Sequence, residues 1–172
     1  MKRLIFTLLS LVGFLAGYSQ MTNNGGTITV ENGANLVIEG NYTNTGAGTI
    51  DIDGTVTLKG NLVNNGSANA INASSFGKLK FNGISGQEIT GSQSNTFYCS
   101  VEVDNAAGVA LTSTSTGAPQ VLDSTLILTN GKVTLNQFDL TLSNEGVTTP
   151  SATRYVVTNS TGKLKAPIAD AN

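Results

Sequence analysis

Short segments in which apolar and polar residues alternate follow one another along most of the chain. Ile50 and Ile52 are apolar positions two residues apart, and so are Leu126 and Leu128. A period of two is typical of half-buried β-strands. After residue 20, no segment keeps the 3.6-residue apolar period of a helix for more than two turns. The pattern therefore predicts an all-β fold, with strands at residues 27–30, 36–39, 49–52, 55–59, 78–82, 100–104, 109–112, 125–129, 132–136, 139–143 and 154–158.

Three of these strands share a glycine-bounded template, at residues 33–40, 54–60 and 77–83. The closing glycines stand at positions 40, 60 and 83, and the block 40–46 matches the block 60–66 position by position. A strand-rich repeat of roughly 20 to 25 residues is the signature of a solenoid. A single repeat of that length cannot bury its own apolar residues, so neighbouring repeats must stack.

The repeat favours a parallel β-solenoid of about seven coils over an antiparallel β-sandwich. Short strands at regular spacing fit both folds. Only in a solenoid do equivalent residues of successive coils stack about 4.8 Å apart, in columns of like on like. We expect Asn44 and Asn64 to form an asparagine ladder at a turn. We expect two inward columns: Leu36 with Val56 and Leu79, and Ile38 with Leu58 and Phe81.

The first 19 residues are expected to be a secretory signal peptide. Lys2 and Arg3 precede an apolar run over residues 4–16, and Gly17-Tyr18-Ser19 supplies small residues for cleavage before Gln20. A membrane-spanning helix would need about 20 apolar residues. The mature chain, residues 20–172, is then one solenoid domain that is secreted to the cell exterior or the outer surface, with no part inserted in a membrane.

The composition of the mature chain agrees with an extracellular β protein. Charged residues are only 12% of the sequence, against roughly 25% in ordinary globular proteins. Without Lys2 and Arg3, seven basic and eleven acidic residues remain, a net charge of −4. No basic stripe is present, so nucleic-acid binding has no electrostatic basis. The single cysteine, Cys99, excludes an internal disulfide framework and is expected to be buried beside Phe97 and Val101.

Several later segments resemble a known class of proteins. They are Phe81-Asn82-Gly83, Gln87-Glu88-Ile89-Thr90-Gly91, Val101-Glu102-Val103-Asp104-Asn105 and Leu126-Ile127-Leu128-Thr129-Asn130-Gly131. The chain resembles the β-solenoid regions of large bacterial surface proteins that the type IX secretion system exports. The resemblance implies export across the outer membrane and a role as a stalk or adhesin-like module. Because no C-terminal sorting domain is recognised, we expect the chain to be the N-terminal part of a longer protein, or a truncated product.

Candidate chemistry is sparse. The chain has no histidine, which excludes a Ser-His-Asp triad and a histidine metal site. Asp51 and Asp53 are the best acidic pair; alternation places both on the outer face of a strand. The pair could be the two carboxylates of a polysaccharide lyase or hydrolase. It could also bind calcium, which needs six to eight oxygens, some of them from Glu31 and Glu39. The simpler interpretation of the pair is a solvated strand face.

A carbohydrate surface is the other candidate. Tyr42 is the aromatic ring most plausibly exposed, although a ring that covers the edge of the core is the simpler interpretation. Threonine-rich strands, such as those at residues 27–29 and 55–57 and at Thr141, would make flat outer faces suited to a regular polymer, or would simply reflect the β propensity of threonine.

The sequence therefore predicts a non-catalytic structural or adhesin-like module without cofactor or metal. The alternative is a carbohydrate-binding accessory module of a secreted polysaccharide-degrading system. A possible ligand surface comprises Tyr42, Asp51 and Asp53, and the expected partner is an extracellular polysaccharide or another surface. An uncovered final coil near Ala166 would favour edge-to-edge self-association.

Overall fold

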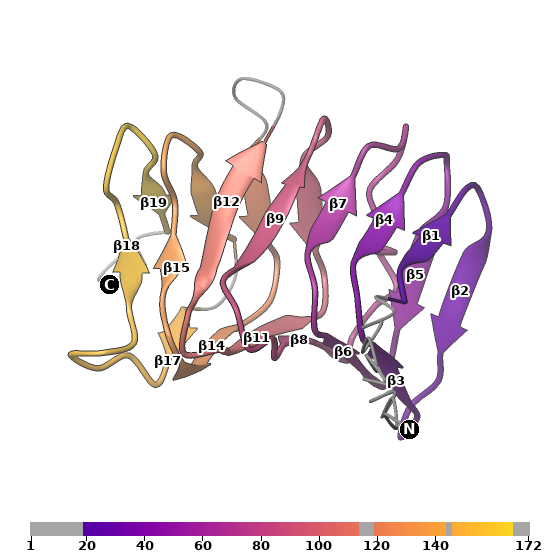
Figure 1. Ribbon diagram of the computed structural model, residues 1–172, viewed down its shortest axis with the longest axis horizontal. Helices are drawn as coiled ribbons and strands as arrows, with labels where there is room; N and C mark the ends of the chain where they lie inside the picture. Colours follow the sequence, from indigo (N-terminus) through magenta and orange to yellow (C-terminus); the bar gives the residue numbers. More distant parts are fainter. Residues whose placement is uncertain (1–18, 114–118, 144–145, 167–172) are drawn as a thin grey trace, which may run out of the picture.

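A computed structural model describes residues 19–113, 119–143 and 146–166, and in these residues the regular secondary structure is entirely β-strand. All pairings between the named strands are parallel. The strands wind around a common interior in three layers (Figure 1). The predicted all-β parallel solenoid is confirmed, and the antiparallel sandwich is not favoured.

The front sheet is the longest layer. Its strand order is that of the chain, and each strand between the two end strands pairs with the strand one coil before and one coil after it. It contains seven strands: β1 (Met21–Asn23), β4 (Tyr42–Asn44), β7 (Leu62–Asn64), β9 (Gln87–Gly91), β12 (Val109–Ser113), β15 (Val133–Thr134) and β18 (Val156–Val157).

The other two layers close the coil. The lower sheet has six strands: β3 (Asn35–Ile38), β6 (Thr55–Leu58), β8 (Lys78–Phe81), β11 (Ser100–Asp104), β14 (Leu126–Asn130) and β17 (Val147–Thr148). The rear layer has two parts. Between them, a single parallel bridge joins Ile50 of the second coil to Ile71 of the third. The parts are β2 (Thr27–Val30) with β5 (Thr49–Ile52), and β10 (Asn95–Phe97), β13 (Gln120–Leu122), β16 (Leu140–Leu142) and β19 (Leu164–Lys165).

The described residues complete about six turns, one fewer than expected. The difference arises because the coils after the second are longer: along the front sheet the first two span 21 and 20 residues, and the later ones 27, 22, 24 and 23. Asn44 and Asn64, which lie on adjacent coils, are 20 residues apart, whereas Asn61 and Glu88 are 27 residues apart. The third coil carries extra residues between strands, and these additions form the irregular parts of its surface.

The inward columns are confirmed. Val56 pairs with Leu36 on one side and Leu79 on the other, and Leu58 pairs with Ile38 and Phe81. Leu36, in the first coil, is only half-buried, while the remaining members are buried. Both columns run on into later coils, the first through Val101 and Leu126 and the second through Val103 and Leu128.

The predicted asparagine ladder is confirmed and is longer than expected. The Asn44 amide donates to Asn64 Oδ1 over 3.1 Å, and Asn64 donates to Asn95 Oδ1 over 3.0 Å. Asn95 donates in turn to Gln120 Oε1 over 3.0 Å. All four side chains are buried. A carboxamide both donates and accepts, so one amide per coil can satisfy its neighbours where water is excluded.

The glycines of the template allow the coils to approach closely at the corners. A Cβ on Gly60 would lie 2.5 Å from Asn41 Oδ1 and from the carbonyl carbon of Gly40. A Cβ on Gly77 would clash with the carbonyl oxygen of Gly54. Neither Gly60 nor Gly77 has a positive φ, so the requirement is space between coils rather than an unusual backbone conformation.

Candidate functional site

Tyr42 is not an exposed ring, so it cannot provide a stacking surface. The side chain is only 2% exposed and belongs to the core. Its hydroxyl accepts a hydrogen bond of 3.4 Å from Asn23 Nδ2, and burial raises its pKa. The reason is its register, because Tyr42 pairs with the inward Leu62 of the next coil. The match between blocks 40–46 and 60–66 already aligned these two residues, and that signal could have placed the ring inside.

Asp51 and Asp53 point outward as predicted, but both contact a loop of the same chain. Ser74 Oγ donates to Asp51 Oδ2 over 2.9 Å, and the Phe76 backbone N–H donates to Asp53 Oδ1 over 3.4 Å. In the described residues no group of three or more His, Cys, Asp or Glu side chains is placed to hold a metal ion. The structure does not bring Glu31 and Glu39 into such a group with the pair. Whether Asp51 and Asp53 contribute to a ligand surface stays a prediction.

Cys99 is buried, as alternation predicted. Its side chain is 0% exposed, and desolvation raises the thiol pKa to about 12. A protonated thiol in an apolar interior is a poor nucleophile. Cys99 therefore serves as a small hydrophobic residue of the core.

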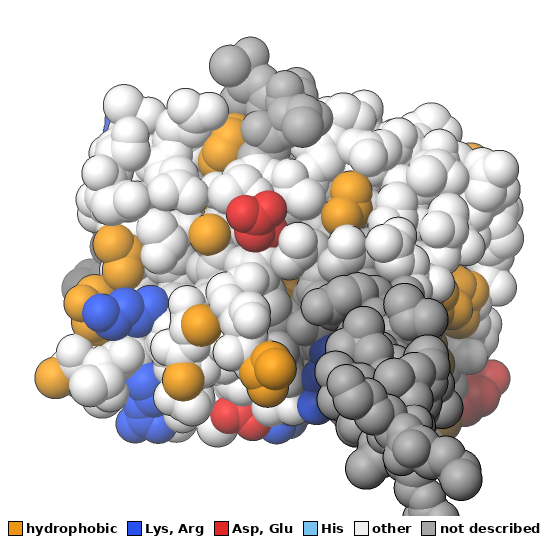
Figure 2. All heavy atoms as spheres, viewed as in Figure 1, with side chains coloured by type: hydrophobic (Ala, Val, Ile, Leu, Met, Phe, Trp, Pro, Cys, Tyr) orange, Lys and Arg blue, Asp and Glu red, His pale blue; other side chains and the backbone are white. Residues whose placement is uncertain are grey.

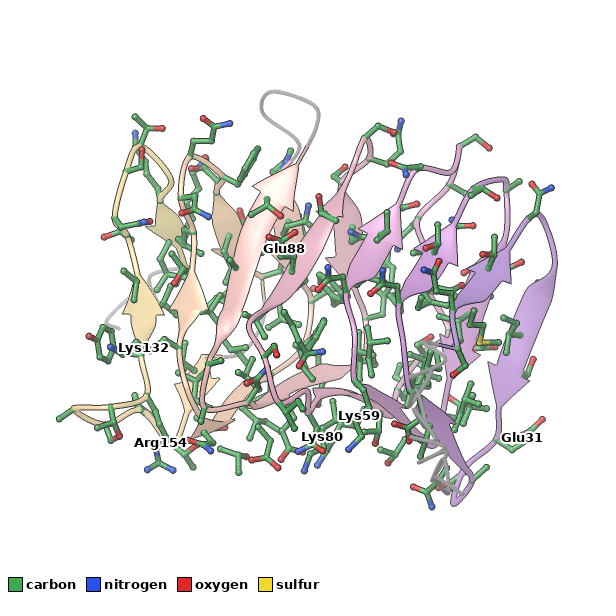
Figure 3. The ribbon with its side chains drawn as sticks, viewed as in Figure 1. Glu31, Lys59, Lys80, Glu88, Lys132 and Arg154 are labelled. Atoms are coloured by element: carbon green, nitrogen blue, oxygen red, sulfur yellow. The ribbon has the colours of Figure 1, made fainter. Side chains whose placement is uncertain are left out.

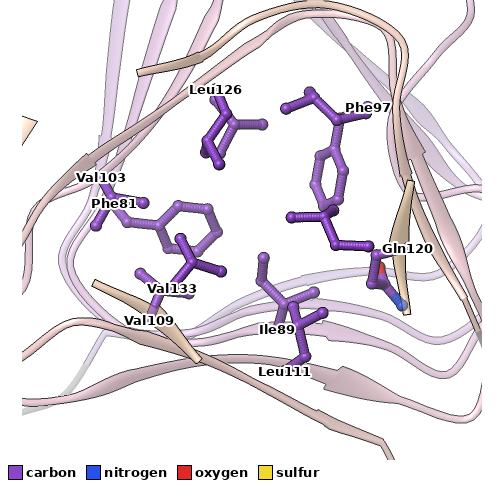
Figure 4. A pocket seen from close by; sticks show the side chains of 12 residues that line it. Phe81, Ile89, Phe97, Val103, Val109, Leu111, Gln120, Leu126 and Val133 are labelled. Atoms are coloured by element: carbon purple, nitrogen blue, oxygen red, sulfur yellow. The ribbon is translucent and has the colours of Figure 1, made fainter. Parts of the chain in front are cut away.

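Among the described residues, the gap in the interior of the middle coils is too small for a ligand. A gap of about 20 Å³ lies among apolar side chains of the middle coils, including Phe81, Ile89, Phe97 and Leu111 (Figure 4). That volume corresponds to about one water-sized probe, and an apolar lining offers a water molecule too few partners. This gap is therefore not a ligand site.

Glu102 is the centre of a network of charged side chains on the outer face of the lower sheet. Lys78 Nζ lies 2.9 Å from Glu102 Oε2, and Thr129 Oγ1 donates to Glu102 Oε1 over 2.9 Å. Lys80 lies 3.4 Å from Glu102 and 2.7 Å from Asp104. Burial raises the pKa of Glu102, but the hydrogen bonds from Lys78 and Thr129 and the two lysine charges outweigh it and hold the pKa below its ordinary value. The network joins three coils. Its two lysines are paired with its two carboxylates, so little net charge remains for a ligand.

The outer surface of the front sheet is flat and nearly free of charge. Figure 2 shows mostly uncharged side chains on this face, with one acidic group near its centre, and Figure 3 places Glu88 there over β9 and β12. Five strands contribute one residue each to a single in-register column: Thr22, Thr43, Val63, Thr90 and Thr112. The column gives the front sheet a threonine-rich outer face, whereas the threonine-rich strands expected from the sequence lie in the rear layer (β2 and β16) and the lower sheet (β6).

A groove of about 480 Å³ lies at the corner between the lower and front sheets. Gln20, the stacked turns at Gly40 and Gly60, and the side chains of Glu39 and Lys59 line it. Asn41 and Asn61 precede β4 and β7 and also line it. Figure 3 shows Lys59 at this lower edge of the molecule. A polar groove that carries one acidic and one basic side chain and has an apolar wall can bind a small polar molecule.

One wall of the groove is the loop 83–86, which belongs to the longer third coil. Ile84 at its tip is 100% exposed. The loop is held at both ends, since the Gly83 N–H donates to Gln87 Oε1 over 2.7 Å and Asn105 Nδ2 donates to the Ser85 carbonyl over 2.7 Å. Gln87 and Asn105 are both buried. Alternation could not predict this wall, because it lies in a turn outside the repeat.

Comparisons with protein-family profiles, with curated proteins and with solved structures found no match to this chain. Within the described ranges, no helix has both the length and the apolar character needed to cross a bilayer. The functional interpretation therefore depends on the geometry of the chain itself.

Proposed function

We propose that the chain is a secreted or cell-surface structural module that adheres through its front sheet to extracellular polysaccharide or to a similar regular surface. The signal peptide expected at residues 1–19 supports export. The observation that carries the proposal is the in-register outer column of the front sheet, which repeats an uncharged β-branched side chain once per coil. A flat face with a repeat of about 4.8 Å suits contact with a regular polymer rather than with a small substrate.

The stacked interior supports a structural role. Continuous apolar columns and the buried amide ladder couple each coil to its neighbours, so the unit behaves as a rigid spacer. The flat face would then be held in one fixed orientation. Export by the type IX secretion system remains part of this proposal, as the resemblance of the sequence suggests.

Bead attachment tests the adhesive function. Beads coated with the mature chain should attach to films of cellulose, chitin or agarose, and Thr43→Lys with Thr90→Lys should abolish attachment by placing charges on the front face. The matched control is Thr57→Lys, which alters the outer face of the lower sheet. Unchanged attachment of the front-face variant, or no attachment of the parent to any film, would contradict adhesion through the front sheet.

The location has its own test. Antibodies raised against the mature chain should label intact cells of the producing bacterium, or should detect the chain in the culture medium. A protein found only inside the cells would contradict the structural display role.

A second candidate is the carbohydrate-binding accessory module. The corner groove favours it, because a bounded polar cavity suits a few sugar units better than a flat polymer surface does.

A further inference from the structure

The corner groove contains two amide groups whose orientation is fixed. The Asn61 backbone N–H donates to Asn41 Oδ1 over 2.8 Å, and the Glu88 backbone N–H donates to Asn61 Oδ1 over 2.9 Å. Both oxygens are therefore engaged, and the two NH₂ groups have no acceptor among the described residues. The coil spacing places these donors about 4.8 Å apart along the groove. Two fixed donors at such a spacing can meet successive hydroxyl groups of one ligand.

Charged groups of both signs flank these donors. Glu39 and Lys59 both line the groove. Lys59 Nζ donates to Asn82 Oδ1 over 2.9 Å, and an ammonium group has three donors, so two more can reach a ligand. The Glu39 carboxylate can accept hydrogen bonds from hydroxyls. A carboxylate beside the lysine disfavours an anionic ligand.

Ile84 adds an apolar surface at the entrance. A fully exposed isoleucine is usually found on a flexible loop. Here the loop is fixed at both ends by hydrogen bonds to the buried side chains of Gln87 and Asn105. Gln87 is further tied by its Nε2 to the Leu58 carbonyl over 2.9 Å. The side chain is thus presented to solvent on a fixed support, which lowers the entropy cost of packing a ligand against it.

The combination of groups selects among ligand classes. Fixed amide donors, a carboxylate acceptor and one apolar ledge match a pyranose ring, whose hydroxyls donate and accept while its C–H face is apolar. A peptide strand would need a free sheet edge, but β4 and β7 are hydrogen-bonded on both sides.

We propose that this groove binds one or two neutral hexopyranose units of a polysaccharide, with Asn41 and Asn61 as hydroxyl donors, Glu39 as acceptor and Ile84 against the ring. The inference deepens the proposed adhesive function and assigns it a second, saturable site at the edge of the front sheet. Every described strand begins at Met21 or later, so the chain from Gln20 to Asn172 keeps the whole site.

Calorimetric titration of this mature chain with soluble oligosaccharides tests the proposal. The probes are the hexasaccharides of cellulose, galactan, mannan, laminarin and chitin, and at least one should bind with a saturable isotherm. Asn61→Asp keeps the oxygen that accepts from Glu88 but replaces the NH₂ donor, so affinity should fall roughly tenfold. Ile84→Ser should weaken binding by a similar factor. The control Asn65→Asp changes an exposed asparagine outside the groove and should leave affinity unchanged.

Absence of binding by all five probes at millimolar concentration would overturn the proposal. So would binding that neither variant weakens, since the sugar would then lie elsewhere. If Asn61→Asp lowers the thermal stability, the test rests on Ile84→Ser alone. Ile84 is fully exposed, so its replacement should leave the fold intact. Neither result depends on bead attachment, because the bead variants lie on the front face, outside the groove, and the two proposals can therefore fail separately.

Discussion

Each inward side chain in this solenoid packs between equivalent residues of the coils before and after it. Leu58 lies between Ile38 and Phe81 and is 0% exposed. Its neighbour Thr57 points outward and pairs with Lys80. One of these adjacent residues therefore faces the core and the other faces solvent. The same substitution should lower the stability greatly at the first and hardly at the second.

Leu58→Asp should unfold several coils, whereas Thr57→Asp should be nearly neutral. The first buries an unpaired carboxylate in the column, which costs far more than the few kcal/mol that a cavity there would. The second places a carboxylate opposite Lys80. Thermal melting followed by circular dichroism measures both, and a Leu58→Asp variant that melts within a few degrees of the parent would show that the column is wrong.

Asn64→Asp should destabilise the chain by about 3 kcal/mol or more. The new oxygen would replace the Nδ2 donor that bonds Asn95 Oδ1, and it would also face the carbonyls of Ala68 and Ser94. The control is Asn65→Asp, because Asn65 is exposed and uses its oxygen to accept from the Ser92 N–H. Urea unfolding of both variants gives the comparison; equal stabilities would contradict a buried amide ladder.

Strands and their loops differ in how far the sequence predicts them. The columns and the Asn44–Asn64 pair followed from the repeat, because burial imposes the same residue type at equivalent positions. Tyr42 was a candidate for an exposed ring because it lies in a turn-like Asn-Tyr-Thr segment; its burial contradicts that candidate and agrees with the simpler interpretation of a core ring. The position of the loop 83–86, and of the groove beside it, is set by the extra residues of the third coil. Alternation within a strand does not show which coil has extra residues.

Acid should weaken the links between β8, β11 and β14. The pKa of Glu102 is held below its ordinary value of 4.5, so its ion pairs stabilise the fold at higher pH and are lost as the pH falls through the folded-state pKa. Between about pH 5 and pH 3 the parent should lose more stability than Glu102→Gln, whose side chain does not titrate. Urea unfolding across this range measures the difference. Parallel pH profiles for the two proteins would show that Glu102 contributes nothing to the acid response.

At the scale of the whole molecule, the described solenoid has open edges. The strands β17, β18 and β19 pair on one side only among the described residues, and Leu164 of β19 is 39% exposed. Unpaired strand edges favour association with another chain. Six turns correspond to a rod of about 29 Å, and end-to-end association would lengthen it.

The mature chain should therefore self-associate as its concentration rises. Lys165→Pro removes a backbone donor from β19 and should reduce the association. Sedimentation velocity over a hundredfold concentration range measures it. A strictly monomeric parent would mean that the edge is covered, and the expected self-association would be wrong.

The register between coils is the claim on which the columns, the ladder, the flat face and the groove all depend. Thr57 and Lys80 face outward on adjacent coils and are direct partners, 23 residues apart. The double variant Thr57→Cys with Lys80→Cys should form a disulfide on mild oxidation of the folded chain, because neighbouring strands bring the Cα atoms within bonding range. Thr57→Cys with Glu102→Cys, two coils apart, should not, and buried Cys99 should not interfere. Mass spectrometry of tryptic peptides reads out the bond. Cross-linking of the first pair but not the second is the predicted result; no cross-link in the first pair, or equal cross-linking in both, would contradict the stacked parallel solenoid.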